Sequence, residues 1–334
     1  MPRTIRALPG LLVAGLLFLS GCGLPFGGDD RPADWTEAPV VPEITGDLKD
    51  QFLEDVAAAD IHGMRPDVFA KIGDSNTELR RNLFGFGCSV VEYGDQGDLA
   101  PTVEKFKETE FAPDLALPEC QPANSFSRFS AAARSGTLAD YAAVPLDGPP
   151  NSLVDRTDRR CRSGETLVGC EIREIQPRYM IAMSGTNDLA FAANLGVADP
   201  ETNISLHLAL LAARIRLAGS VPVLSTLPPI YITSTPDVDE WGEVKKANAA
   251  IYEAGRDLEI PVINLWSALT EDQMIDHGLD TDGVHLNVYG GVDSPDLLAN
   301  SVNLTDEALR YGANRRNLIW VQTLKALDEA AESK

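Results

Sequence analysis

Four short runs of apolar residues divide the chain, and each has the length of one buried strand. They cover residues 67–72, 178–183, 221–227 and 260–265. Turn-forming pairs follow the first three runs: Gly73-Asp74, Ser184-Gly185 and Pro228-Pro229. Mainly apolar strands of this length, bounded by turn residues, are typical of a parallel sheet that is covered on both faces.

Helical periodicity separates these runs. Asp199-Pro200 is a typical helix start and Gly219 a typical helix end. Between them, apolar residues recur on one helical face at Ile204, Leu208, Leu211 and Ile215. The same period recurs over residues 244–258 and 320–331. Strands that alternate with helices predict one doubly wound α/β domain, with its functional site at the carboxyl ends of the strands.

Two stretches, residues 84–125 and 144–176, follow neither the strand nor the helix pattern. We interpret them as insertions in a single domain that spans residues 48–334. Each insertion contains two cysteines.

The N-terminal segment has the pattern of an export signal. Arg3 and Arg6 precede an uncharged apolar run over residues 8–19, which is shorter than the roughly 20 residues of a membrane-spanning helix. A Leu-Ser-Gly-Cys tetrapeptide that ends at Cys22 follows, and it resembles the lipobox of bacterial lipoproteins, whose cysteine receives lipid. We therefore interpret residues 1–21 as a signal peptide and Cys22 as the lipidation site. An ordinary secretory signal with an incidental cysteine is the alternative.

Residues 22–47 are rich in Gly, Pro and Asp and lack any period, which predicts a flexible tether between the lipid and the domain. The alternative is a docked arm, in which Trp35 and the pair Val40-Val41 pack against the domain. Two or more acyl chains anchor a protein stably. The expected location is therefore the bacterial cell envelope, outside the cytoplasm, with the lipid on Cys22 in the membrane.

The charge balance narrows the choice of partners. The 334 residues include 50 acidic and 28 basic residues, which gives a formal net charge of −22. Such a charge repels phosphate backbones and anionic lipid headgroups. It argues against nucleic-acid binding and against membrane docking through a basic patch.

Four cysteines remain when Cys22 is set aside: Cys88, Cys120, Cys161 and Cys170. An even number in an exported protein predicts two disulfides. The short polar segment between Cys161 and Cys170 suits a bridged hairpin. Cys88 and Cys120 then form the second pair by exclusion.

Residues with catalytic potential follow the predicted strands. Ser75 comes just after the first strand, in Gly73-Asp74-Ser75, where it would begin a helix and expose its hydroxyl at the sheet edge. Taken alone, this tripeptide is more typical of a serine that caps a helix after a turn.

Two later segments add to this picture. Asn187 follows the second strand, and its side-chain amide can donate to a negatively charged oxygen. Asp282 and His285 are three residues apart, which lets the carboxylate orient the imidazole toward a nucleophile. Alternatively, the segments around Asn187 and around Asp282 and His285 are turns without a catalytic role. A metal cluster of His277, Asp280, Asp282 and His285 is a further alternative.

The order of these motifs resembles that of the SGNH, or GDSL, hydrolase superfamily. A serine follows the first strand, an asparagine follows a later strand, and an Asp-x-x-His motif comes near the end of the chain. Ser75 matches the serine of the superfamily's first block, Asn187 the asparagine of its Gly-x-Asn-Asp block, and Asp282 and His285 its Asp-x-x-His block. The resemblance covers roughly residues 65–330. It implies a flavodoxin-like, three-layer α/β/α fold with a mainly parallel sheet.

The glycine block of this family is assigned to residues 133–140, with Gly136 as the oxyanion glycine and Gly148 as the second choice. Two features depart from the family pattern. Asn76 stands where Leu or Ile usually follows the serine, and the gap between Ser75 and Gly136 is long.

The resemblance implies a serine ester hydrolase that needs no metal or organic cofactor. His285, oriented by Asp282, would take the proton of Ser75 as the hydroxyl attacks an ester carbonyl. The backbone N–H groups of Ser75 and Gly136 and the side chain of Asn187 would stabilise the oxyanion. The expected substrate is an ester of a glycan, a lipid or a small acyl group. An acyltransferase that acts on a glycan and a non-catalytic binding lipoprotein are the alternatives.

Overall fold

The fold is built on one sheet of four parallel strands. The computed structural model describes residues 31–145, 160–195, 199–231 and 241–333. Among them the sheet contains β1 (Arg65–Gly73), β2 (Pro177–Met183), β3 (Val221–Ser225) and β4 (Val262–Ile263), in that order across the sheet. Every neighbouring pair is parallel. All four predicted strands are therefore present.

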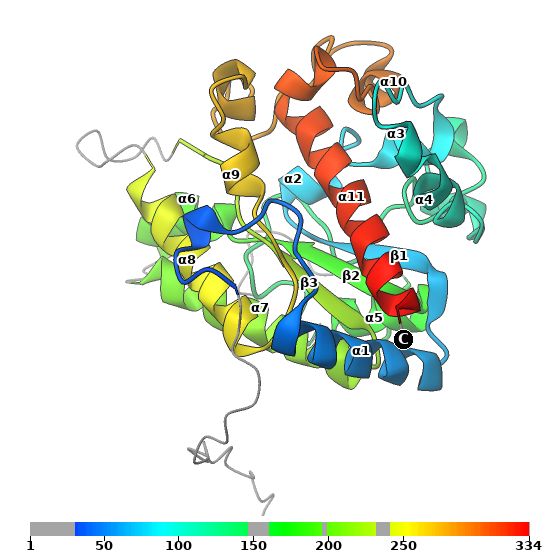
Figure 1. Cartoon of the computed structure of the whole chain (residues 1–334), viewed down its shortest axis with the longest axis vertical. Helices are drawn as coiled ribbons and strands as arrows, with labels where there is room; N and C mark the ends of the chain where they lie inside the picture. Colours follow the sequence, from blue (N-terminus) through cyan, green and yellow to red (C-terminus); the bar gives the residue numbers. More distant parts are fainter. Residues whose placement is uncertain (1–30, 146–159, 196–198, 232–240, 334) are drawn as a thin grey trace, which may run out of the picture.

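Helices cover both faces of the sheet (Figure 1). On one face, α1 (Gly46–Ile61) packs against α11 (Gly312–Glu332). On the other face, α7 (Pro200–Leu217) packs between α5 (Leu167–Ile175) and α8 (Gly242–Asp257). The protein thus has the three-layer α/β/α architecture that its sequence predicts.

The long helices follow the predicted periodicity. Helix α7 begins after Asp199, whose side chain accepts a hydrogen bond from the backbone N–H of Thr202, and α8 coincides with the predicted helix over residues 244–258. The remaining helices are α2 (Ser75–Glu78), α3 (Phe84–Cys88), α4 (Ala100–Lys105), α6 (Thr186–Leu195), α9 (Leu265–Leu269) and α10 (Leu297–Ser301). Short 3₁₀ helices lie at Trp35–Glu37, Gly97–Leu99, Pro113–Leu115, Pro118–Cys120, Ile275–Gly278 and Ala308–Arg310.

Strand β4 is shorter than the apolar run over residues 260–265 predicts. The run is interrupted because Asn264 caps α9, with its side chain accepting from the backbone N–H of Ser267. Leu265 is therefore the first residue of a helix, and it is fully buried there.

The free edge of β1 carries one further ladder step. The backbone N–H of Gly73 donates to the carbonyl of Ala132 at 3.0 Å, and the N–H of Arg134 donates to the carbonyl of Gly73 at 2.9 Å. Gly73 and Ala133 form a parallel bridge. Residues 132–134 thus occupy the place of a second strand in the flavodoxin-like order 2-1-3-4-5. This position brings the glycine block beside the end of β1.

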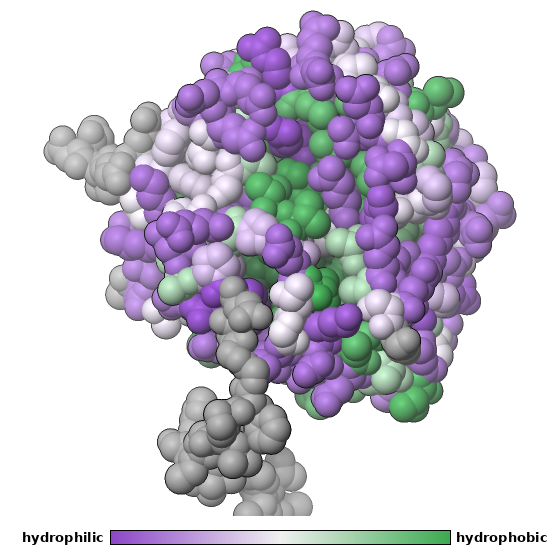
Figure 2. Space-filling view, viewed as in Figure 1, coloured by the Kyte–Doolittle hydropathy of each residue, from purple (hydrophilic) through white to green (hydrophobic). Residues whose placement is uncertain are grey.

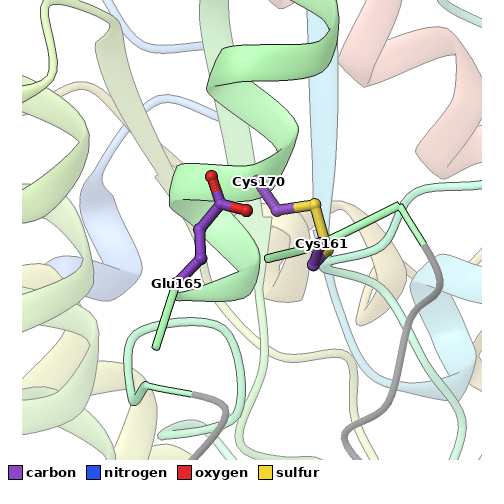
Figure 3. A group of neighbouring side chains, drawn as sticks. All are labelled: Cys161, Glu165 and Cys170. Carbon is purple, nitrogen blue, oxygen red and sulfur yellow. A yellow bond between two sulfur atoms is a disulfide. The ribbon is translucent and has the colours of Figure 1, made fainter. Parts of the chain in front are cut away.

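The structure contains both predicted disulfides. Cys88 is bonded to Cys120. Cys161 is bonded to Cys170, and Figure 3 shows this second disulfide. The stretch over residues 84–125 consists of short helices, as expected for an insertion. The interpretation of residues 144–176 is wrong in part, because α5 packs against β1 and α7 and belongs to the helical layer. Residues 146–159 of that stretch lie outside the described residues.

The prediction of a flexible tether is wrong for the N-terminal arm, which we define as residues 31–45. The Arg31 guanidinium donates to the carbonyls of Gly255 and Arg256 at 3.2 and 2.9 Å. The Asn264 side chain donates to the carbonyl of Trp35 at 2.8 Å, and the Trp35 indole packs edge-to-face against Trp266. The arm is docked because the domain supplies both hydrogen-bond partners and an aromatic surface for it.

The surface of the α11 face is mostly hydrophilic, with apolar side chains gathered near its centre (Figure 2). The arm and α11 border a groove of about 670 Å³, whose apolar lining includes Val40, Val41, Leu309, Leu318 and Ile319. In the described part of the chain, no helix is both long and apolar enough to cross a membrane. The predicted signal peptide and Cys22 lie outside the described residues.

Candidate active site

The site begins where β1 and β2 end side by side. Gly73 and Met183, the last residues of the two strands, are paired in the parallel register. The chain therefore leaves both strands at the same edge of the sheet, as Asp74-Ser75 and as Ser184-Gly185. A Cβ on Gly73 would lie 2.1 Å from the carbonyl oxygen of Met183, so only glycine fits between them.

Ser75 is the first residue of the short helix α2. Asp74 caps this helix, with its side chain accepting from the backbone N–H of Asn76 at 3.0 Å. The N–H of Ser75 stands at the first helical position, where no preceding turn supplies a carbonyl partner. A hydroxyl and an unused N–H donor of the same residue are thus placed at the edge of the sheet.

The loop that follows the 3₁₀ helix Ile275–Gly278 brings His285 to Ser75. The distance from His285 Nε2 to Ser75 Oγ is 2.8 Å, and the distance from His285 Nδ1 to Asp282 Oδ2 is 2.6 Å. The three side chains therefore form an unbroken series of hydrogen bonds. A carboxylate on Nδ1 favours the proton on that nitrogen, which leaves Nε2 able to accept the serine proton.

Asp282 also shapes the loop that carries His285. Its Oδ1 accepts from the backbone N–H groups of Val284 and His285, both at 2.9 Å. Burial acts to raise the pKa of Asp282, but the bonds from the His285 ring and from these two N–H groups outweigh it and hold the pKa below its usual range. Asp282 is therefore ionised when it faces His285.

Gly136 lies in a tight turn beside helix α2. The turn is held on one side by Glu78 of α2, whose carboxylate accepts from the backbone N–H of Ser135 at 2.6 Å. On the other side, the Thr137 hydroxyl contacts the carbonyl of Gly73. Gly136 has a φ of 77°, a left-handed conformation that favours glycine. The residue assigned as the oxyanion glycine is thus held between the end of β1 and α2.

Asn187 reaches the same turn from helix α6. Its Nδ2 donates to the carbonyl of Thr137 at 2.8 Å, and the residue is 8 % exposed. An amide nitrogen carries two protons, so one remains to be donated to another acceptor. The bond to Thr137 links Asn187 to the segment that carries Gly136.

Two buried carboxyl groups lie behind these residues. Burial raises the pKa of Asp74 to about 6, although N–H groups of Asn76 and Thr186 favour its ionised form. Burial also raises the pKa of Asp188 to about 7, and the charges of Asp140 and Asp74 add to the rise. Both residues stood in the sequence motifs, but only the tertiary structure identifies their shared environment.

Asn76 and Arg316 are functional candidates that sequence reasoning missed. The Asn76 side chain contacts the backbone on both sides of His285, and Arg316 of α11 donates to the Asn76 carbonyl at 2.5 Å. The departure from Leu or Ile at position 76 was the only available signal. No local pattern connects Arg316 to the site.

The structure does not gather His277, Asp280, Asp282 and His285 into a metal site, which was the alternative to a triad. The His277 ring lies against Trp241, with 4.8 Å between ring centres. Among the described residues, one group has metal-ligand geometry, namely Cys161, Glu165 and Cys170 (Figure 3). Its two sulfurs are joined in a disulfide, so no thiolate is available to bind a metal.

No curated protein matches the chain. One solved structure, LAE5, an alpha/beta hydrolase enzyme from the metagenome of Lake Arreo in Spain, is 15 % identical with a TM-score of 0.42. The alignment covers 78 % of this chain and 95 % of that chain.

The family comparison is more informative. Residues 127–291 match the GDSL-like Lipase/Acylhydrolase family. The matched range includes Gly136, Asn187, Asp282 and His285. Ser75 lies before this range, but its hydroxyl is within hydrogen-bond distance of His285. Together with the three-layer fold, this match supports the assignment of the chain to the SGNH/GDSL hydrolase superfamily as an ester-hydrolysing enzyme.

Proposed function

We propose that this enzyme hydrolyses esters through a Ser75–His285–Asp282 triad and a covalent acyl-enzyme. The observation that carries the proposal is the hydrogen-bond series from Ser75 Oγ to His285 and on to Asp282, with lengths of 2.8 and 2.6 Å. A nucleophile in reach of a base that a third group orients is the arrangement that acyl transfer requires.

In the first step, Ser75 Oγ attacks the ester carbonyl carbon while His285 Nε2 takes the hydroxyl proton. The imidazolium that forms is stabilised by the ionised Asp282. As the tetrahedral intermediate collapses, the ester C–O bond breaks and His285 gives its proton to the leaving alcohol. Water then attacks the acyl-enzyme, with His285 again as the base, and releases the acid and Ser75.

Three donors are proposed to stabilise the oxyanion: the N–H groups of Ser75 and Gly136 and the second amide proton of Asn187. The bonds of Ser135 to Glu78 and of Asn187 to Thr137 support this assignment. They hold two of the donors in place before substrate arrives, which avoids a reorganisation cost during the reaction.

The central experiment compares wild-type protein with Ser75→Ala and with Ser205→Ala, a change at the surface of α7. Turnover of p-nitrophenyl acetate should fall by several orders of magnitude in Ser75→Ala alone. A fluorophosphonate should label wild-type protein once, on Ser75. Wild-type turnover in Ser75→Ala, with the label on another residue, would rule the mechanism out.

A series of p-nitrophenyl esters of increasing chain length would define the acyl group that the enzyme accepts. The same assay with an added glycan acceptor tests for transfer instead of hydrolysis. Acylated glycan as the main product would replace hydrolase with acyltransferase. Catalytically inactive protein that still binds acylated ligands would favour the binding lipoprotein.

We also propose that the protein is anchored in the bacterial cell envelope, outside the cytoplasm, by lipid on Cys22. The charged start, the short apolar run and the tetrapeptide that ends at Cys22 support this proposal. Metabolic labelling with a clickable fatty acid should mark wild-type protein and not Cys22→Ala. Unlabelled, wholly soluble wild-type protein would contradict lipidation.

A further inference from the structure

We infer that Asn76 is a positioning residue that sets the distance between Ser75 and His285; this inference rests on the proposed function. Asn76 directly follows Ser75 and is 1 % exposed. Its Nδ2 donates to the carbonyl of Val284 at 3.0 Å, and its Oδ1 accepts from the N–H of Leu286 at 3.3 Å. Val284 and Leu286 are the two chain neighbours of His285. One side chain thus holds the backbone on both sides of the catalytic base.

An amide at position 76 is required by this geometry. The two contacts need one donor and one acceptor at the end of a short side chain, which asparagine provides. Leucine has nearly the same shape but offers neither group. Aspartate offers only acceptors when ionised and would place one against the Val284 carbonyl.

The other bonds of the His285 loop shape it without tying it to the nucleophile. Asp282 bonds to Val284 and His285 inside the loop, and the N–H of Asp280 donates to the carbonyl of His285 at 2.7 Å. Among the hydrogen bonds of the described residues, those of Asn76 and the Ser75–His285 bond itself join this loop to α2. Asn76 is therefore the structural link between the two halves of the catalytic pair.

Asn76 is itself held firmly. Its N–H donates to Asp74 at 3.0 Å, and its carbonyl accepts from Arg316 Nη1 at 2.5 Å. Arg316 is buried and also donates to the carbonyl of Arg81. A side chain on a fixed backbone can transmit its position to its partners, so the position of Ser75 relative to His285 is set before substrate binds.

Loss of the Asn76 contacts should lower kcat, because catalysis is sensitive to the distance between Ser75 and His285. Displacing a reacting group by about 1 Å can cost roughly 10²-fold in rate. Asn76→Leu should therefore lower kcat by about that factor and leave KM within a few-fold. It should also lower the thermal midpoint, because the Val284 carbonyl and the Leu286 N–H lose their partners.

The matched control is Asn124→Leu. Asn124 is also buried, and its side chain also donates to a backbone carbonyl, that of Gly87, and accepts from a backbone N–H, that of Phe126. Neither partner belongs to α2 or to the His285 loop. This variant should lose thermal stability while kcat per folded molecule stays at the wild-type value.

The experiment measures the thermal midpoint, kcat, KM and the rate of fluorophosphonate labelling in both variants and in Ser75→Ala. A reduced kcat and slower labelling in Asn76→Leu, but not in Asn124→Leu, support the inference. Wild-type kcat and labelling in folded Asn76→Leu, with Ser75→Ala inactive, overturn the role of Asn76 and leave the proposed function standing. Full activity of Ser75→Ala would remove the proposed function itself.

If Asn76→Leu does not fold, Asn76→Asp carries the same test. It keeps the acceptor for the Leu286 N–H and loses the donor to Val284, so kcat should still fall by at least 10-fold in folded protein. Unchanged kcat in Asn76→Asp would overturn the inference.

Discussion

The carboxyl groups of Asp74 and Asp188 interact behind Ser75, where both are buried. Burial raises the pKa of Asp188 to about 7, and the negative charge of Asp74 contributes to that rise. Asp74 caps the helix that begins at Ser75, and Asp188 accepts from the backbone N–H of Ala139 at 2.9 Å. Two carboxyls are thus used to fix the segments around the site, and their ionisation opposes folding.

This arrangement predicts a pH-dependent effect of Asp188→Asn on stability. The pKa of Asp188 is about 7 in the folded protein, whereas the ordinary pKa of an aspartate is 3.8, so the folded state holds the proton more tightly. Its contribution to stability is complete below about pH 4 and is lost as the pH rises to 7. The free energy of unfolding of Asp188→Asn, relative to wild type, should therefore rise by up to about 4 kcal/mol over this range, at about 1.4 kcal/mol per pKa unit.

Urea denaturation at intervals from pH 2 to pH 8 measures this difference. Asp98→Asn is the control of opposite sign, because the hydrogen bond from Lys325 lowers the pKa of Asp98. Its stability relative to wild type should fall as the pH rises toward about 4 and stay constant above that pH. A difference between Asp188→Asn and wild type that does not vary with pH would show that Asp188 is not protonated preferentially in the folded state.

Asn187→Ala tests the oxyanion assignment. Loss of one oxyanion donor typically lowers kcat by about 10²–10³-fold, with little change in KM. The bond to Thr137 is lost as well, which should lower the free energy of unfolding by about 1 kcal/mol. Asn187→Asp should be slower still, because a carboxylate repels the oxyanion.

The decisive comparison is kcat and the thermal midpoint on the same preparation. If Asn187 only forms a turn, the midpoint will fall and kcat per folded molecule will not. That result would remove Asn187 from the catalytic mechanism.

Asp282→Asn should lower kcat by roughly 10⁴-fold, as the loss of the orienting carboxylate does in a Ser-His-Asp site. An amide N–H beside His285 Nδ1 favours the tautomer with the proton on Nε2, which then cannot accept the proton of Ser75. Asp280→Asn, a change two residues away, should retain activity within about 10-fold. Equal activity of the two variants would exclude Asp282 as the orienting group.

The pKa of Asp282 also predicts the shape of the pH–rate profile at acidic pH. Hydrogen bonds hold the pKa of Asp282 below its usual range, so Asp282 stays ionised above about pH 4. The pH–rate profile of wild-type enzyme should therefore contain no step from Asp282 above that pH. An additional ionisation that disappears in Asp282→Asn would contradict this assignment.

The two disulfides should contribute unequally to stability. The Cys88–Cys120 bond spans 32 positions and the Cys161–Cys170 bond spans 9. In the chain-entropy model, a longer loop restricts the unfolded chain more, which predicts about 4 and about 3 kcal/mol. Denaturant unfolding of the two double-serine variants measures both values, and a larger loss for the Cys161–Cys170 pair would contradict the entropic account.

Docking of the N-terminal arm predicts a large effect of Trp35→Ala. The indole is 9 % exposed and packs against Trp266, with 6.0 Å between ring centres. Truncating a buried aromatic side chain typically costs about 3–5 kcal/mol. The neighbouring exposed change Glu37→Ala should cost less than about 0.5 kcal/mol. Equal thermal midpoints for the two variants would mean that the arm is free in solution.

The sequence identified the helices and strands of the fold because buried positions produce a pattern of apolar residues along the chain. A parallel strand covered on both faces must be apolar over most of its length, as residues 179–183 of β2 are. A helix that covers the sheet must repeat every 3.6 residues, as α7 does. These patterns failed where a side chain changed the local structure, as when Asn264 capped α9 and shortened β4.

The sequence by itself determined which residues are candidates for the proposed chemistry: Ser75, Asn187, Asp282 and His285 stand in motifs that can be read in order along the chain. Only the tertiary structure decided how Ser75 meets His285 across 210 positions, and that Asn76 links the two segments. It alone showed that Trp35 is docked against Trp266. The physical reason is that periodicity reports whether a residue is buried, whereas its hydrogen-bond and packing partners come from remote segments that meet only when the chain has folded.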